Sequence, residues 1–95
     1  MTRKLFTCPC CGYYTLEEQP PGTYEICDIC YWEDDPIQFE DPFLDEGANE
    51  VSLMEAQLNF LEFGASDEIC LDAVRKPTEH DKKDPNFKLI KWNMD

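Results

Sequence analysis

Two Cys-x-x-Cys pairs dominate this chain: Cys8 with Cys11, and Cys27 with Cys30, with fifteen residues between the pairs. Zn²⁺ binds four thiolates at the corners of a tetrahedron, and two tight turns bring two such pairs together without long loops. The spacing therefore predicts that these four cysteines bind one structural Zn²⁺.

Six cysteines would also suit three disulfides in a small secreted protein. Residues 1–7 contain no apolar signal-peptide core, which favours the reducing cytoplasm and a metal site over disulfides. No apolar run approaches the roughly 18 residues of a membrane helix. With 95 residues the chain has room for one domain over residues 1–95, and a bound metal would help so short a chain to fold.

The charge is large and unevenly placed, with 21 acidic residues against 8 basic ones and a net charge of −13. Residues 5–74 contain seventeen carboxylates and no Lys or Arg. Such a field repels nucleic-acid phosphates and attracts basic proteins. We therefore expect a basic protein partner. A nucleic-acid-associated zinc ribbon is an alternative that only Arg3, Lys4 and the tail from Arg75 would support.

Short runs of aromatic and β-branched residues surround both cysteine pairs. They predict an α+β fold with a zinc-ribbon-like β-hairpin over 4–32, across which the two Cys-x-x-Cys turns, or knuckles, face each other. Gly12 permits a left-handed backbone after the first pair, whereas Tyr31 takes that place after the second. The expected strand segments are 4–7, 13–16 and 23–26.

An acidic loop is expected at 33–48, because this segment is rich in carboxylates and interrupted by prolines, with no clear period. Its charged side chains would face solvent. Its large apolar side chains are expected to reach into the core: Ile37, Phe39, Phe43 and Leu44.

A helical part is expected at 52–75. Ser52 and Glu55 form a capping box and Gly64 is a typical helix end, which together predict a helix over 53–63. Ser66 is expected to cap a second, shorter helix. An irregular tail at 76–95 would end in an extended segment from Phe87 to Trp92 that packs on the domain. The apolar stripe of the first helix would comprise Leu53, Ala56, Leu58, Phe60 and Leu61.

The chain also contains this set of short motifs: Cys-Pro-Cys-Cys-Gly-Tyr at 8–13, Glu-Ile-Cys at 25–27, Trp-Glu-Asp-Asp at 32–35, Gly-Ala-Asn at 47–49, Ser-Leu at 52–53 with Glu-Ala at 55–56, Arg-Lys-Pro at 75–77 and Asp-Pro-Asn at 84–86. Over about residues 7–86 they resemble the cysteine-rich CPCC domain family. The resemblance implies a small, mostly bacterial, metal-binding domain without an assigned activity. Some relatives are encoded near secreted toxins, which hints at an immunity role.

Three further side chains are of types that can react or bind a metal: Cys10, Cys70 and His80. Cys10 lies inside the first knuckle and is either a bystander or a reactive thiol whose pKa is lowered by the metal. Cys70 has apolar neighbours at helical spacing and is expected in the core. His80 lies among charged residues and is expected to be exposed.

The segment Trp32-Glu33-Asp34-Asp35 is the strongest candidate for a catalytic site, because clustered carboxylates can hold Mg²⁺ or share a proton in acid–base catalysis. No His, Lys or Arg lies nearby in the sequence to polarise a substrate. We therefore assign no catalytic residue and favour a turn or helix start here. A small enzyme or redox protein using Cys10 or the three carboxylates stays an alternative.

The favoured function is a non-enzymatic, metal-stabilised acidic module that binds a basic protein, most concretely a toxin nuclease. The acidic loop and its aromatic residues would form the docking surface, with a merely solvated loop as the alternative. The predicted partner-binding residues are Trp32, Glu33, Asp34, Asp35, Phe39, Glu40, Asp41, Asp45 and Glu46.

Overall fold

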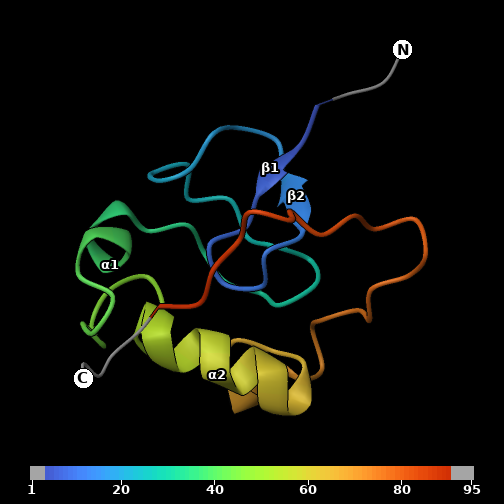
Figure 1. Ribbon diagram of the computed structural model, residues 1–95. Coiled ribbons are helices and arrows are strands. Elements are labelled where there is room, and N and C mark those ends of the chain that lie inside the picture. The colour runs from blue at the N-terminus through green and yellow to red at the C-terminus, as the bar shows by residue number, and fades with distance from the viewer. Residues whose placement is uncertain (1–3, 91–95) are drawn as a thin grey trace.

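The computed structural model describes residues 4–90. A two-stranded sheet and a long helix lie on opposite sides of the two knuckles, as Figure 1 shows. Neither helix in this part of the chain has the length and apolar character needed to cross a membrane. The elements are β1 (Phe6–Thr7), β2 (Tyr14–Leu16), α1 (Pro36–Glu40), α2 (Leu53–Phe63) and the short 3-10 turn η1 (Glu68–Cys70).

The α+β class is confirmed, but the strand pairing differs from the expected hairpin. Strands β1 and β2 pair antiparallel around the first knuckle. The expected strand at 23–26 does not pair with β2; instead Ile26 forms an antiparallel bridge with Glu33. Each knuckle therefore lies at the closed end of its own short antiparallel pair, β1 with β2 for the first and Ile26 with Glu33 for the second. The two pairs are local, and no strand within residues 4–90 joins them. The β1–β2 register is Phe6 with Leu16 and Thr7 with Tyr14, with an irregularity between the two pairs.

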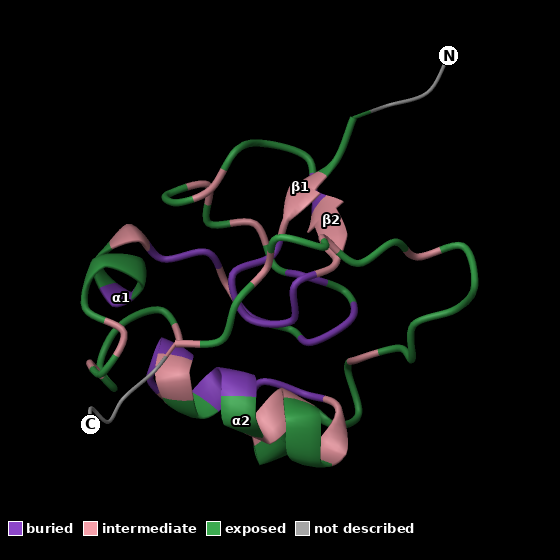
Figure 2. Ribbon diagram, viewed as in Figure 1, coloured by how far each residue is buried: buried purple, intermediate pink, exposed green. Residues whose placement is uncertain are grey.

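Helix α2 has the bounds that its capping signals predicted. Ser52 Oγ accepts a hydrogen bond from the Glu55 N–H at 3.1 Å, and Gly64, with φ of 89°, ends the helix. Only part of the apolar stripe is buried: Leu58 and Leu61 are 48 % and 58 % exposed. Figure 2 shows buried residues on the side of α2 that faces the knuckles. The helix packs along one narrow face, so the stripe was predicted too wide.

The second helix is shorter than predicted and has a different cap. Asp67, not Ser66, caps η1, and its side chain accepts from the Ile69 N–H at 3.3 Å. The Ser66 N–H donates to the Cys30 carbonyl at 2.8 Å, so Ser66 is held against the second knuckle instead. Cys70 is half-buried at the edge of this turn, so the expectation of a core position was wrong.

The acidic loop contains the short helix α1, and its apolar side chains do not form the core. Ile37, Phe39 and Phe43 are exposed, which contradicts the prediction, while Leu44 is partly buried. The fully buried side chains of this loop are polar: Asp34 and Gln38 are both 0 % exposed. A buried amide is tolerated only when its hydrogen bonds are made.

Gln38 makes those hydrogen bonds with the loop that surrounds it. The two N–H groups of its Nε2 are shared among the carbonyls of Leu44, Asn49 and Val51, at 3.2, 3.1 and 3.1 Å. Its Oε1 accepts from Asn49 N–H at 3.1 Å and from Asn49 Nδ2 at 2.9 Å. The acidic loop is therefore organised around a satisfied polar side chain rather than around an apolar anchor.

The C-terminal segment returns across the first knuckle, a contact that was not predicted from the sequence. The Tyr14 N–H donates to the Lys82 carbonyl at 2.9 Å, and the Asp84 N–H donates to the Gly12 carbonyl at 2.8 Å. Ile90 packs against the buried cluster, whereas Trp92 lies outside the described residues. The cluster itself consists of Cys8, Cys10, Cys11, Leu16, Cys27, Ile29, Cys30, Trp32, Leu53 and Ala56.

Candidate metal centre

The two knuckles share one backbone pattern. In each, the first cysteine donates its N–H to the carbonyl five residues later, at 2.9 Å for Cys8 and 3.0 Å for Cys27. The residue four positions later donates back to that cysteine's carbonyl, Gly12 at 2.9 Å and Tyr31 at 2.7 Å. Gly12 and Tyr31 are therefore equivalent, and both have a left-handed backbone with φ of 83° and 70°. The expected conformation at Gly12 is confirmed.

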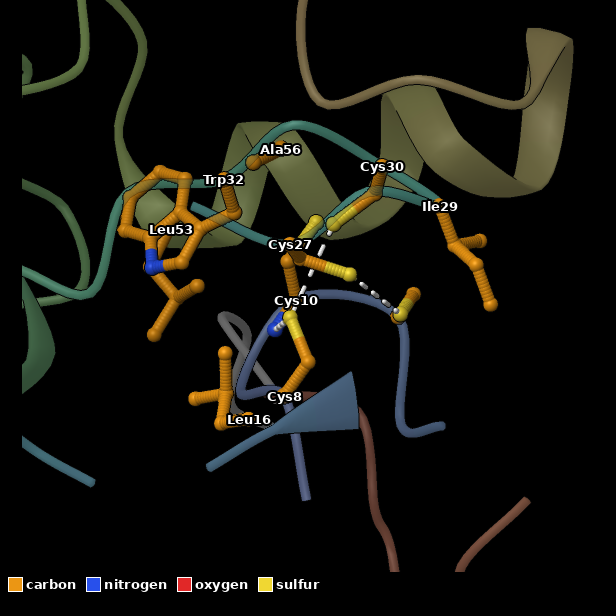
Figure 3. Packing of buried hydrophobic residues seen from close by; sticks show 10 residues of the cluster. Cys8, Cys10, Leu16, Cys27, Ile29, Cys30, Trp32, Leu53 and Ala56 are labelled. Atoms are coloured by element: carbon orange, nitrogen blue, oxygen red, sulfur yellow. Dashed lines mark hydrogen bonds between the residues drawn. The ribbon is translucent and has the colours of Figure 1, made fainter. Parts of the chain in front are cut away.

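The four predicted ligands are brought together. The sulfurs of Cys8, Cys11, Cys27 and Cys30 all lie within 4.8 Å of one another, and all four residues are buried. The Cys8–Cys30 and Cys11–Cys27 sulfur distances are 3.6 and 3.7 Å. Four thiolates at about 2.3 Å from a tetrahedral Zn²⁺ would be about 3.8 Å apart. The four sulfurs could therefore hold a metal ion, and their spacing is consistent with zinc. Figure 3 shows Cys8, Cys27 and Cys30 within the buried core.

Donors from the surrounding chain point at the sulfurs. The Cys10 N–H lies 3.4 Å from Cys8 Sγ, and Thr15 Oγ1 donates to Cys27 Sγ at 3.1 Å. Such donors stabilise a thiolate and orient it toward a metal. All six cysteines are free thiols rather than disulfides.

Without a metal, the four thiols cannot all ionise together. Neighbouring thiols, Cys11 first among them, donate to Cys27 and lower its pKa. Burial raises the pKa of Cys8 and of Cys30, and the hydrogen bond with Cys27 raises that of Cys11. A bound cation would displace the thiol protons and so allow the four sulfurs to be thiolates together.

Gln57 ties the first knuckle to helix α2 and to the tail. Its Nε2 donates to the Pro9 carbonyl at 2.8 Å, and its Oε1 accepts from the Ile90 N–H at 2.8 Å. The side chain is 3 % exposed. No role for Gln57 was predicted from the sequence, although a glutamine directly after Ala56 in the predicted helix was a usable signal.

Arg75 fastens the second knuckle to the following segment. Its backbone N–H donates to the Asp28 carbonyl at 3.1 Å, and its Nε donates to Asp28 Oδ2 at 2.8 Å. Its two terminal nitrogens donate to the Asp81 carboxylate at 2.8 and 2.9 Å. The Arg75 guanidinium holds the pKa of Asp81 below its usual range.

Two of the predicted carboxylates are structural. Asp34 is buried, and its Oδ2 accepts from Thr23 N–H and Oγ1 at 2.9 and 2.8 Å. Asp35 caps α1 and accepts from the Ala48 N–H at 2.9 Å. Burial acts to raise the pKa of Asp35, but backbone donors, that of Ala48 first, outweigh it and lower the pKa.

The predicted partner-binding set is therefore corrected. Trp32, Asp34 and Asp35 are at most 5 % exposed, so a partner cannot contact them without opening the fold. Glu33 is partly buried, and its backbone pairs with the Asn49 side chain at 2.9 and 2.8 Å. The exposed members are Phe39, Glu40, Asp41, Asp45 and Glu46.

The fold buries Cys10 and leaves His80 exposed. Cys10 is 1 % exposed and lies outside the group of four sulfurs, so its thiol does not face solvent. His80 is exposed, as predicted.

Two comparisons with known proteins bear on this site. No curated protein matches the chain. The family model described as Cysteine-rich CPCC matches residues 6–81, a span that includes both knuckles, the acidic loop and α2. The resemblance seen in the motifs is confirmed, and the chain belongs to the cysteine-rich CPCC family.

Proposed function

We propose that the chain is a non-enzymatic protein-binding module, held together by one structural Zn²⁺, whose acidic surface docks a basic protein. The ligands are the four clustered thiolates, which zinc prefers. A site in which the protein supplies all four ligands leaves no open position for a substrate. The donor set therefore supports a structural metal rather than a catalytic one.

The observation that carries the binding proposal is the construction of the acidic loop. Buried Asp35 and Gln38, with Asn49, fix its backbone through hydrogen bonds, while its exposed side chains carry the charge. A surface that is already ordered loses little conformational entropy on binding. This arrangement supports a docking surface over a loop that is only solvated.

The exposed side chains of the loop suit a cationic partner. Within residues 4–90, the ion pairs are those of Arg75 with Asp28 and Asp81, so the exposed carboxylates of the loop have no described cation beside them. Acidic surfaces of this kind accelerate association with basic proteins. Exposed apolar anchors lie between the charges, as interfaces require. The most concrete partner is a toxin nuclease, whose cationic nucleic-acid site the loop would cover.

Native mass spectrometry of the protein purified from its own cells, at mild salt, is the first test. We expect one zinc and a retained basic protein. The association rate of that pair should then fall steeply as salt rises, because ions screen the steering field. A rate that does not change with salt would contradict the proposal.

A charge-matched pair of variants separates the loop from the overall charge. The loop variant carries Glu40→Gln, Asp41→Asn, Asp45→Asn and Glu46→Gln. The control carries Glu62→Gln, Glu68→Gln, Asp72→Asn and Glu79→Gln, which are also exposed. We expect the loop variant to associate roughly tenfold or more slowly and the control to change little. Equal slowing would show that the loop is not the docking surface.

A further inference from the structure

A hollow of about 200 Å³ lies between the second knuckle, the segment 48–51 and the turn η1. Its apolar wall includes Ile26, Tyr31, Val51 and Ile69. Ile26 is 47 % exposed and Ile69 is 72 % exposed. The fold therefore leaves the apolar wall of this hollow partly uncovered, outside the metal centre.

The rim of this hollow is acidic. Glu33, Glu50 and Asp67 line it, and its lining residues include no Lys, Arg or His. None of the three carboxylates takes part in an ion pair within residues 4–90. Burial raises the pKa of the Cys70 thiol in the same hollow, and the Asp67 charge raises it further, as does that of Glu50. Three carboxylates thus surround the apolar wall of the hollow.

Tyr31 is the aromatic residue among those that line the hollow, and it is 38 % exposed. Its backbone is left-handed, a conformation that side chains other than glycine rarely adopt, and Gly12 fills the equivalent position of the first knuckle. The knuckle therefore needs only a glycine at this position. The tyrosine ring is not required by the metal site.

We propose that this hollow receives an arginine side chain of the basic partner, an inference that rests on the proposed function. A guanidinium stacks on an aromatic ring and donates paired hydrogen bonds to carboxylates. Its aliphatic stem packs against apolar walls. An anion would be repelled by the rim, and a purely apolar side chain would leave the carboxylates desolvated without a partner. Charge complementarity thus selects the occupant.

The test uses a probe that does not depend on the natural partner. The zinc-loaded protein, labelled with ¹⁵N, is titrated with the peptide Ac-Gly-Gly-Arg-Gly-Gly-amide and followed by amide chemical shifts. Matched peptides carry lysine, or neutral citrulline, in place of arginine. We expect saturable shifts confined to the residues of the hollow, weaker binding of the lysine peptide and no binding of the citrulline peptide.

Two variants and one control locate the binding. Tyr31→Gly keeps the backbone that the knuckle needs and removes the ring, and we expect it to weaken binding about three- to tenfold. Glu50→Gln, at an exposed position with no described hydrogen bond to its side chain, should also weaken binding without affecting folding. Glu46→Gln removes an exposed charge outside the hollow and should leave binding unchanged.

The outcomes separate this inference from the proposed function. Shifts spread over the whole acidic surface, equal binding of the lysine or citrulline peptide, or no effect of both Tyr31→Gly and Glu50→Gln would overturn the arginine site. If those results came with salt-sensitive association of a basic partner, the binding module would stand without this pocket. If the peptide bound here but no basic partner were retained, the pocket would stand and the proposed function would fall.

Discussion

Replacing Cys27 with serine should unfold the protein rather than weaken it slightly. Five of the eleven buried apolar residues in the described chain are cysteines, so the core is built largely around the four-sulfur cluster. A structural zinc contributes about 10–16 kcal/mol of binding free energy, most of which is folding free energy. This binding free energy is comparable with the whole stability of a small domain, about 5–15 kcal/mol, so a variant that cannot hold the metal should not stay folded.

Cys10→Ser is the matched control, because Cys10 is equally buried in the first knuckle but lies outside the cluster. Thermal unfolding followed by circular dichroism, with zinc measured by native mass spectrometry, compares the two variants. We expect Cys10→Ser to keep one zinc and to melt cooperatively at a somewhat lower temperature, since it buries a hydroxyl. Cys27→Ser should show no cooperative transition. A Cys27→Ser protein that melted within a few degrees of the wild type would refute this account of the metal.

Three other perturbations test the supports of the site. Gln57→Leu removes the partner of the Pro9 carbonyl and should cost about 1–3 kcal/mol in urea unfolding, because a buried carbonyl is left unpaired. Gly64→Ala places a side chain at φ of 89° with open space around it, so unfolding free energy should fall by about 1–2 kcal/mol from backbone strain alone. In the folded protein Arg75 lowers the pKa of Asp81 below the value of about 3.9 that an unfolded chain has. Ionised Asp81 therefore stabilises the fold above about pH 4, and this stabilisation is lost as the pH falls through the folded-state pKa. The stability difference between wild type and Asp81→Asn should therefore shrink in unfolding measurements below about pH 4; a difference that is constant with pH would count against the pair.

Local signals account for what the sequence predicted well. The candidate metal ligands are set by a fixed spacing within each turn. The left-handed residue after the first pair is set by the absence of a side chain at Gly12. The bounds of α2 follow from the Ser52 cap and the Gly64 end, which act within one turn of the helix. Such features need no knowledge of distant residues.

The acidic loop shows what only the tertiary structure decides. Its composition predicted a loop with charged side chains in solvent and apolar side chains in the core. In the structure Asp34 and Gln38 are buried, whereas Phe43 is exposed. The burial of these polar groups depends on partners elsewhere in the chain, Thr23 for Asp34 and Asn49 for Gln38. Burial of a polar side chain needs hydrogen-bond partners, and the fold as a whole supplies them for Gln38 and for Asp34 Oδ2, while Asp34 Oδ1 is buried without one. The sequence by itself thus determined the four clustered cysteines and the main helix, whereas long-range hydrogen bonds decided which carboxylates lie inside and which face solvent.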